Sequence, residues 1–319
     1  MTRQPTFQNE LQQGLGAWLP PGLIVAALFV ASAVQAQSPT PAPAPNGGAA
    51  SRPAAVASPG RPAASGPVAA ASGVKIEPGP SPSHPWLAAP PRVTAEAYFS
   101  NLEDGARIET PYRVTFGLSG GWGLAPIAKP VAGKSGHHHL LINRDLPLNF
   151  KEALPFNEQY MHFGKGQMEA VLNLAPGKYK LRLLLADEKH LPHFVFSKPV
   201  TLTVTAKKGD VDPKTLVTRT VEVLNIKPDA RLRPPFRVQF HASGFNVAHL
   251  VQKDKDTGHF RVTWTPATGR PVEIAFLNGQ TEAWFAPPPG AYALKLELVD
   301  NLDPTKILAS AAPLAVRVE

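Results

Sequence analysis

The chain has 319 residues, a formal net charge of +8 and no cysteine. Without cysteine there are no disulfides and no thiolate ligands, so any bound metal must be held by imidazole, carboxylate or thioether groups. Only Met161 and Met168 follow the initiator methionine, which argues against a methionine-rich carrier of cuprous copper. The basic residues are scattered singly, which argues against nucleic acid as a partner and predicts a solubilising surface.

Residues 1–36 have the pattern of a signal peptide. Arg3 is the only basic residue before an apolar stretch over 23–34, and Val34 to Ala36 supply the small-x-Ala pattern that a signal peptidase cleaves. The stretch is short for a membrane span, and no later segment is long enough to form one. The sequence therefore predicts cleavage after Ala36 and a periplasmic or secreted mature chain without a transmembrane segment. An uncleaved N-terminal anchor is the alternative.

Residues 37–93 are rich in proline, alanine and serine, beginning with "QSPTPAPAPNGGAA". A segment of this composition cannot bury enough apolar surface to offset the entropy lost on ordering. We therefore expect a disordered, partly extended linker that carries no chemistry of its own.

Short alternating apolar runs begin at residue 94, among them "YRVTFGL", "HHHLLI", "YKLRLLLA" and "VTLTV", separated by Gly, Pro and Asn clusters. Runs of this length with a period of two indicate strands, and many of them at this spacing indicate a β-sandwich. The pattern then repeats, because 105–120 matches 229–244 and 166–187 matches 279–300. We predict an all-β chain with two tandem immunoglobulin-like β-sandwich domains, a His-rich one over 94–206 and a degenerate copy over 218–319.

The second copy predicts how the histidines of the first are oriented. "GHHHLLI" at 136–142 aligns with "GHFRVTW" at 258–264, in which Phe, Val and Trp alternate on one face. Side chains alternate along a strand, so His138 is expected to face the core and to donate to a backbone carbonyl. His137 and His139 are then expected on the outer, solvent side, about 6–7 Å apart along the strand.

Three more histidines are expected near this outer face. His162 aligns with Ala275 and points away from the core, while His190 and His193 follow the strand that ends at Asp187. The predicted metal ligands are His137, His139, His162, His190 and His193. Asp187 or Glu169 are candidate acceptors behind them, although Asp187 is equally suited to capping a turn. Imidazole without thiolate suits Cu(II), Zn(II) or Ni(II), and the general affinity order favours copper.

The segments "GLSGGWGLAP", "GHHHLLI", "HFGKGQMEAVLNLAPGKYKLRLLLAD" and "HLPH" together resemble an exported bacterial family, the domain of unknown function numbered 4399. The resemblance covers about 100–204, and the second module resembles the family as a decayed copy. Family members commonly carry Met where this chain has Trp122, and a histidine- or amide-rich stretch where it has Glu188 and Lys189. The resemblance implies the domain and an exported location, and it implies no activity.

Two functions fit these patterns. The first is a periplasmic, non-enzymatic binding protein with a histidine-based Cu(II) or Zn(II) site in the first domain. The second is an adaptor or structural module of the cell envelope that binds a protein or a glycan without a metal. We expect no enzyme, because the sequence contains no nucleophile elbow, phosphate-binding glycine loop or H-E-x-x-H helix. A hydrolytic zinc centre is the enzymatic alternative, and no well-placed general base supports it.

Overall fold

The computed structural model describes residues 84–91, 94–125, 133–147 and 149–319. The predicted signal peptide and most of the predicted linker lie outside the described residues. Residues 84–91, which the sequence assigns to the linker, are described. Their backbone pairs with the second domain, where the amide of Ala88 donates to the carbonyl of Trp284 at 2.9 Å and Leu87 bridges Phe285. Within the described residues, no helix has the length and hydrophobicity that a membrane span requires.

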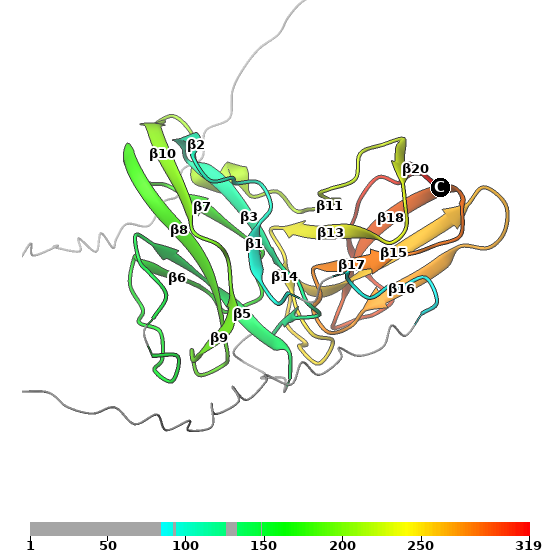
Figure 1. The fold of residues 1–319 in the computed structure, drawn as a ribbon, viewed down its shortest axis with the longest axis horizontal. Coiled ribbons are helices and arrows are strands. Elements are labelled where there is room, and N and C mark those ends of the chain that lie inside the picture. Colours follow the sequence, from blue (N-terminus) through cyan, green and yellow to red (C-terminus); the bar gives the residue numbers. More distant parts are fainter. Residues whose placement is uncertain (1–83, 92–93, 126–132, 148) are drawn as a thin grey trace, which may run out of the picture. The chain divides into compact units, whose positions relative to one another are not determined.

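The first β-sandwich packs a three-stranded sheet against a seven-stranded sheet (Figure 1). The small sheet has the order β1 (Ala97–Phe99), β3 (Tyr112–Leu118) and β7 (Glu169–Leu172). The large sheet has the order β2 (Ala106–Thr110), β10 (Val200–Lys207), β8 (Gly177–Ala186), β5 (Ser135–Ile142) and β4 (Gly123–Leu124). In addition, β6 (Tyr160–Phe163) pairs with β5, and β9 (Pro192–Phe196) pairs with β8.

The second β-sandwich repeats this order strand for strand. Its small sheet is β11 (Thr220–Val223), β13 (Phe236–Ser243) and β17 (Glu282–Phe285). Its large sheet is β12 (Ala230–Leu232), β20 (Leu314–Val318), β18 (Gly290–Asp300), β15 (Thr257–Pro266) and β14 (Asn246–Val247), with β16 (Val272–Phe276) on β15 and β19 (Ile307–Ser310) on β18. The short 3-10 helix η1 (Pro213–Leu216) lies between the copies. This identity of order confirms the predicted all-β fold with two tandem sandwiches.

The core lies between the two sheets of each copy and follows the predicted alternation. Leu140 and Ile142 of β5 are buried in it, as are Phe260 and Trp264 of β15. His138 also faces the core, and its ring meets that of Phe116 edge-on with centroids 4.8 Å apart. The predicted hydrogen bond from His138 is wrong, because among the described residues neither ring nitrogen has a hydrogen-bond partner.

A second, smaller apolar cluster covers the outer face of the large sheet in the first copy. Leu141, Leu184 and Ala186 extend from the outer face of β5 and β8, and Leu154 from the β5–β6 connection packs on them. Leu146, Phe150, Tyr160 and Phe196 surround this group. The prediction that this face is open to solvent is therefore wrong at β5, because a long connection folds back over it.

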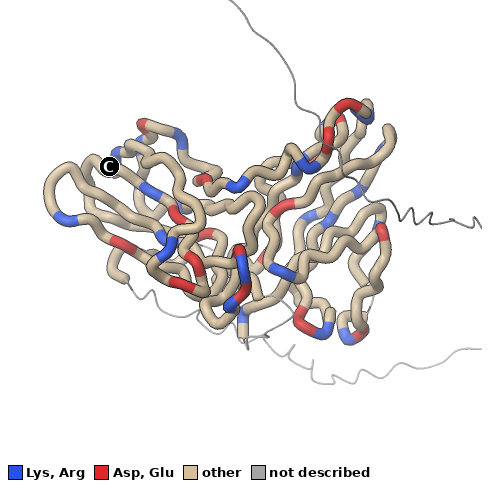
Figure 2. Tube along the Cα trace, turned by 180° about the vertical axis from the view of Figure 1, so that it is seen from behind, with Lys and Arg blue, Asp and Glu red and all other residues tan. Residues whose placement is uncertain are grey.

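Charged residues are distributed over both copies with lysine and arginine interspersed among aspartate and glutamate (Figure 2). Several of them form ion pairs at the surface, such as Lys180 with Asp145 at 2.6 Å and Arg219 with Asp256 at 2.6 Å. This distribution agrees with a solubilising surface.

Candidate metal centre

Strand β5 places two of the histidines. His137 and His139 are two residues apart on the same face of the strand, and their Nε2 atoms approach to 3.0 Å. Both side chains are fully buried. Alternation along the strand predicts that His137 and His139 share a face. Their burial, which the sequence did not predict, is explained by the apolar cluster that covers this face.

His162 comes from the neighbouring strand β6, where it is paired directly with His139. Its ring lies over Gly164, because a Cβ added there would be 2.3 Å from Cε1 of His162. In the second copy the small and the large residue exchange places. Ala275 stands at the position of His162, and Leu277 stands at the position of Gly164. A small residue at 164 is therefore required for the orientation of His162, and this exchange of sizes is a signal that the sequence analysis missed.

His190 lies on the tight turn between β8 and β9. The Asp187 carboxylate accepts hydrogen bonds from the backbone amides of Lys189 and Leu191, each at 2.8 Å, and so closes the turn. The backbone of His190 has φ of 63°, and its carbonyl accepts from the amide of Leu154 at 2.9 Å. Left-handed φ is uncommon outside glycine, so the turn is held by its contacts. Asp187 therefore serves as the turn cap that the sequence allowed.

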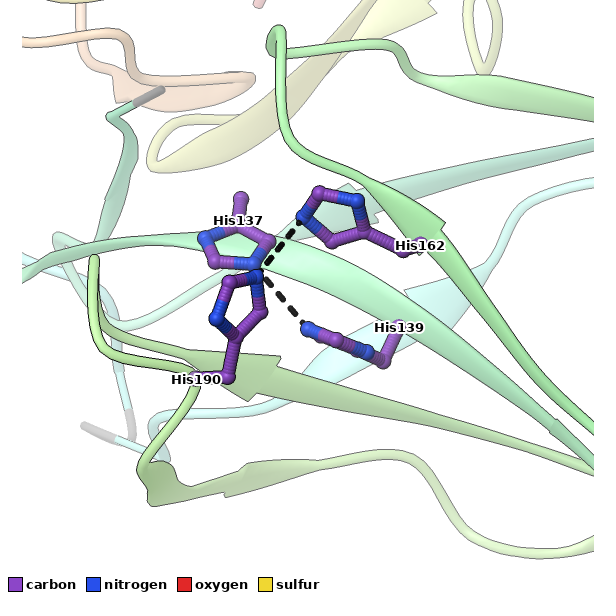
Figure 3. A group of neighbouring side chains, drawn as sticks. All are labelled: His137, His139, His162 and His190. Atoms are coloured by element: carbon purple, nitrogen blue, oxygen red, sulfur yellow. Dashed lines mark hydrogen bonds between the residues drawn. The ribbon is translucent and has the colours of Figure 1, made fainter. Parts of the chain in front are cut away.

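The four histidines form one group, drawn in Figure 3. One ligand atom from each of His137, His139, His162 and His190 can be chosen so that all four atoms lie within 4.8 Å of one another. The Nε2 atoms of His162 and His190 are 3.2 Å apart, which makes a second imidazole pair beside that of His137 and His139. His137 and His139 form the buried floor, whereas His162 and His190 are half-buried.

The fifth predicted ligand, His193, is not part of this group. Its ring packs against Trp122 with centroids 4.9 Å apart, and it has a hydrogen bond with the backbone of Ser135. Glu169 also lies outside the group of four histidines. Its carboxylate accepts from the amide of Gly244 and the hydroxyl of Ser243, each at 2.9 Å, so it links the first copy to the second. The suggestion that Glu169 supports a metal ligand is therefore wrong.

Burial favours the neutral form of three imidazoles of the group, those of His137, His139 and His162. Burial, reinforced by the neighbouring imidazoles, lowers the pKa of His137 to about 2 and that of His139 to about 3. The pKa of His162 is lowered by the same two causes. A metal-binding imidazole must be neutral, so the lowered pKa values of His137 and His139 leave the nitrogens of these two residues available to a metal well below neutral pH.

The orientation of the buried pair is set by packing. In many metal sites the second ring nitrogen donates to a carboxylate or carbonyl. Here Nδ1 of His137 and Nδ1 of His139 are buried without a hydrogen-bond partner among the described residues. The pairing of β5 with β6 and β8, together with the apolar cover, therefore fixes both rings.

Phe156 covers the half-buried side of the group. Its ring centroid lies 4.5 Å from that of His190 and 5.3 Å from that of His162, while 64% of the residue is exposed to solvent. Nothing in the sequence pattern points to Phe156, because the 143–159 segment has no periodic pattern and no counterpart of similar length in the second copy.

The fold and the site together define a tandem β-sandwich protein with four histidines gathered on the outer face of one sheet in its first copy. Residues 114–205 and 238–319 each match the family described as a domain of unknown function (DUF4399). The two matched segments make up more than half of the chain, and the chain belongs to this family. The match confirms the resemblance carried by the sequence motifs, and it includes the second copy as well as the first. A search among curated proteins finds no match.

The similar solved structures include chains of fibronectin-type modules. The fibronectin(III)-like modules of Clostridium thermocellum CbhA are 14% identical and cover 70% of this chain and 92% of their own, with a TM-score of 0.22. The FN1–FN3 domains of chicken CNTN1 are 10% identical and cover 68% of this chain and 66% of their own, with a TM-score of 0.20. A two-domain fibronectin type-III segment of chicken tenascin is 12% identical, covering 70% and 98%, with a TM-score of 0.18. These scores are low, and the description of the fold rests on the strand pairing itself.

Proposed function

We propose that this chain is an exported, non-enzymatic metal-binding protein that holds one Cu(II) or Zn(II) ion through His137, His139, His162 and His190. The observation that carries the proposal is the convergence of four imidazoles from three separate segments on one point. Imidazole is a ligand for both ions. Histidines without a shared function would be expected to lie apart on the surface, rather than in one group beside an apolar cluster.

The composition of the group favours holding a metal over using it in catalysis. The group consists of imidazoles alone, and the nearby carboxylate of Asp187 is occupied by two backbone amides. A hydrolytic centre needs a general base beside an open coordination position. Carrying, buffering or sensing the ion is therefore the role we propose.

The proposed compartment is the periplasm or the exterior of the cell, because residues 1–36 have the pattern of a cleaved signal. Amino-terminal sequencing of the protein purified from its own host tests this part. A mature chain beginning at Gln37 is expected. An intact Met1 on soluble cytoplasmic protein would contradict it.

Metal titration of the full mature chain tests the binding site. Calorimetry with Zn(II) and with Cu(II) is expected to show one ion per chain in the wild-type protein. The His162→Ala/His190→Ala variant should lose this uptake, and it leaves the two fully buried histidines in place to protect the fold. The matched control is His193→Ala, a histidine of the same copy outside the group, which should bind as the wild type does. Absent uptake, or equal uptake by wild type and the double variant, would contradict the proposal.

A second candidate function is an envelope adaptor that contacts a protein or a glycan. It is favoured by Phe194, which is 76% exposed and stacks on Phe150 with ring centroids 4.4 Å apart. Large exposed aromatic residues often mark contact surfaces. Chemical cross-linking in envelope extract separates the two functions. An adaptor predicts a cross-linked product that Phe194→Ser abolishes and His162→Ala/His190→Ala leaves unchanged.

A further inference from the structure

We infer that the four-histidine group is a closed tetrahedral site suited to Zn(II), and that Cu(II) fits it only by distorting its preferred geometry. This inference rests on the proposed function and deepens it, because it names the ion from the arrangement of the rings. The general affinity order, on which the sequence-based preference for copper depends, takes no account of that arrangement.

The distances between donor atoms agree with a single ion at the centre. The Nε2 atoms of His137 and His139 are 3.0 Å apart, and those of His162 and His190 are 3.2 Å apart. A tetrahedral zinc with bonds of about 2.0–2.1 Å places its donor atoms about 3.3–3.4 Å apart. These two pairs need to shift by only a few tenths of an ångström, whereas the widest pair of the four ligand atoms, at up to 4.8 Å, must close by about 1.4 Å before one ion can bind all four.

The ring centroids distinguish a tetrahedron from a plane. The six distances between the four rings are 4.7, 4.9, 4.9, 5.1, 5.1 and 5.6 Å. Rings bound through one nitrogen to zinc would have centroids about 5.2 Å apart in every pair of a tetrahedron. A square plane would give four distances of about 4.5 Å and two of about 6.4 Å. The observed set has no long pair, so the four rings surround a point in three dimensions.

The donor set supports the same ion. Square-planar or tetragonal geometry is typical of Cu(II) and Ni(II), whereas Cu(I) prefers soft thiolate and thioether ligands, and the group offers neither. Zn(II) has no geometric preference of its own and accepts four nitrogens in a tetrahedron. Of the ions that imidazole binds well, zinc matches both the shape and the chemistry.

The site is closed around its centre. Four protein donors fill a tetrahedral coordination sphere and leave no position for water or substrate. On the half-buried side the ring of Phe156 packs against both His162 and His190. An ion held in this way is stored or stabilises the fold, and it has no free position at which to act as a Lewis acid.

Spectroscopy on the full mature chain loaded with Co(II) alone, and separately with Cu(II) alone, tests the geometry. Tetrahedral Co(II) absorbs visible light far more strongly than six-coordinate Co(II), so we expect an intense visible band that Zn(II) abolishes on addition. The band should be lost in His162→Ala/His190→Ala and retained in His193→Ala. The electron paramagnetic resonance spectrum of the Cu(II) form is expected to be that of a flattened tetrahedron.

The outcomes separate this inference from the proposed function. A weak six-coordinate Co(II) spectrum together with an ordinary tetragonal Cu(II) spectrum, both lost in the double variant, would overturn the tetrahedral zinc assignment and leave the metal site standing. Failure of all three ions to bind the wild-type protein would overturn both.

Discussion

The two copies of the sandwich carry different chemistry at the same place on the same sheet. In the first copy, His139 on β5 is paired with Leu184 on β8 and His162 on β6. In the second copy, Arg261 on β15 is paired with Glu297 on β18 and Ala275 on β16. Arg261 donates to the Glu297 carboxylate at 2.8 Å. An ion pair thus stands where the first copy has imidazoles and leucine.

The connection that follows this strand accounts for the difference in burial. It spans residues 143–159 between β5 and β6, but only 267–271 between β15 and β16. The longer segment supplies Leu154 and Phe156 to the cover, and without an equivalent segment the face of the second copy stays partly open to water. A partly exposed ion pair suits that setting and contributes little to stability. One longer connection therefore makes the difference between a partly solvated sheet face and a buried site.

The largest effect is expected from transferring the ion pair into the first copy. His139→Arg/Leu184→Glu removes one donor and places two charges beneath the apolar cover. At a metal concentration of about 1,000 times the Kd, the bound ion stabilises the wild-type chain by about 4 kcal/mol, and this increment should vanish. Thermal unfolding with and without Zn(II) measures it. The reciprocal Arg261→His/Glu297→Leu variant should show no gain in binding, because Ala275 and Asp303, which stand at the positions of His162 and His190, supply no further imidazole.

Truncating one residue of the apolar cover should have a smaller effect on stability. Leu154→Ala truncates a buried side chain of the cover, and we expect a loss of about 2–4 kcal/mol in the free energy of unfolding. Metal affinity should fall with it, because the packed Leu154 side chain positions the backbone amide that donates to the carbonyl of His190. Urea unfolding and calorimetry provide the two readouts. Leu302→Ala, at a residue of the second copy that is 53% exposed, is the control and should cost under about 0.5 kcal/mol.

The core histidine predicts a difference in acid sensitivity between the copies, because Phe260 stands in the position of His138. Burial lowers the pKa of His138 to about 3. As the pH falls below about 6.5, the unfolded chain takes up a proton that the folded chain does not, and stability falls by about 1.4 kcal/mol per pH unit until about pH 3. His138→Phe should remove the part of the slope that belongs to His138, leaving the parts of His137 and His139, and stabilise the metal-free chain more at pH 5 than at pH 7. Equal stabilisation at both pH values would show that His138 ionises freely when folded.

A smaller effect is expected at the glycine beneath His162. Gly164→Ala places a methyl group where the ring lies, so the ring must turn away from the centre. We expect about a tenfold weaker affinity for Zn(II), similar to the loss that follows when a supporting residue of a metal site is changed. Gly209→Ala, where an added Cβ meets nothing within 4 Å, is the matched control. Unchanged affinity in Gly164→Ala would mean that the ring has another route to the same position.

The smallest change in stability is expected at Phe156. Because 64% of this residue is exposed, Phe156→Ala should alter the free energy of unfolding by under about 0.5 kcal/mol. The same substitution uncovers His162 and His190, so the transfer of bound metal to a chelator should become faster. Stopped-flow mixing of the loaded chain with an excess of chelator measures the rate. A rate equal to that of the wild type would show that Phe156 does not limit exit from the site.

The orientation of the histidines was predictable because the chain contains two copies of one module. Alternation in "HFRVTW" placed Phe260, Val262 and Trp264 inside, and the same alternation correctly placed His138 inside with His137 and His139 opposite. The pairing of His139 with His162 was beyond this argument, because period two gives the face of a residue but not the neighbouring strand. The burial of the outer face was missed for another reason. The 143–159 segment lacks a periodic pattern, so its leucine and phenylalanines looked like parts of a loop.

His193 and Glu169 show how residue type alone misleads. His193 is two residues beyond the turn, on the strand that follows, and its ring meets Trp122 instead of the other imidazoles. Glu169 begins a strand of the opposite sheet, so its carboxylate faces the second copy. The position of His193 depends on where the strand after the turn begins, and that of Glu169 on which sheet its strand joins. Composition carries no information about either.

The contacts of Glu169 make the two copies depend on each other. Its carboxylate satisfies a hydroxyl and an amide of the second copy, and the hydroxyl of Thr281 in turn accepts from the amide of Leu118 in the first. If the two copies were separated, buried polar groups of each copy would lose their hydrogen-bond partners. The second copy therefore stabilises the histidine-bearing copy through these hydrogen bonds. Selection can relax its outer face while still preserving the edge through which it supports its neighbour.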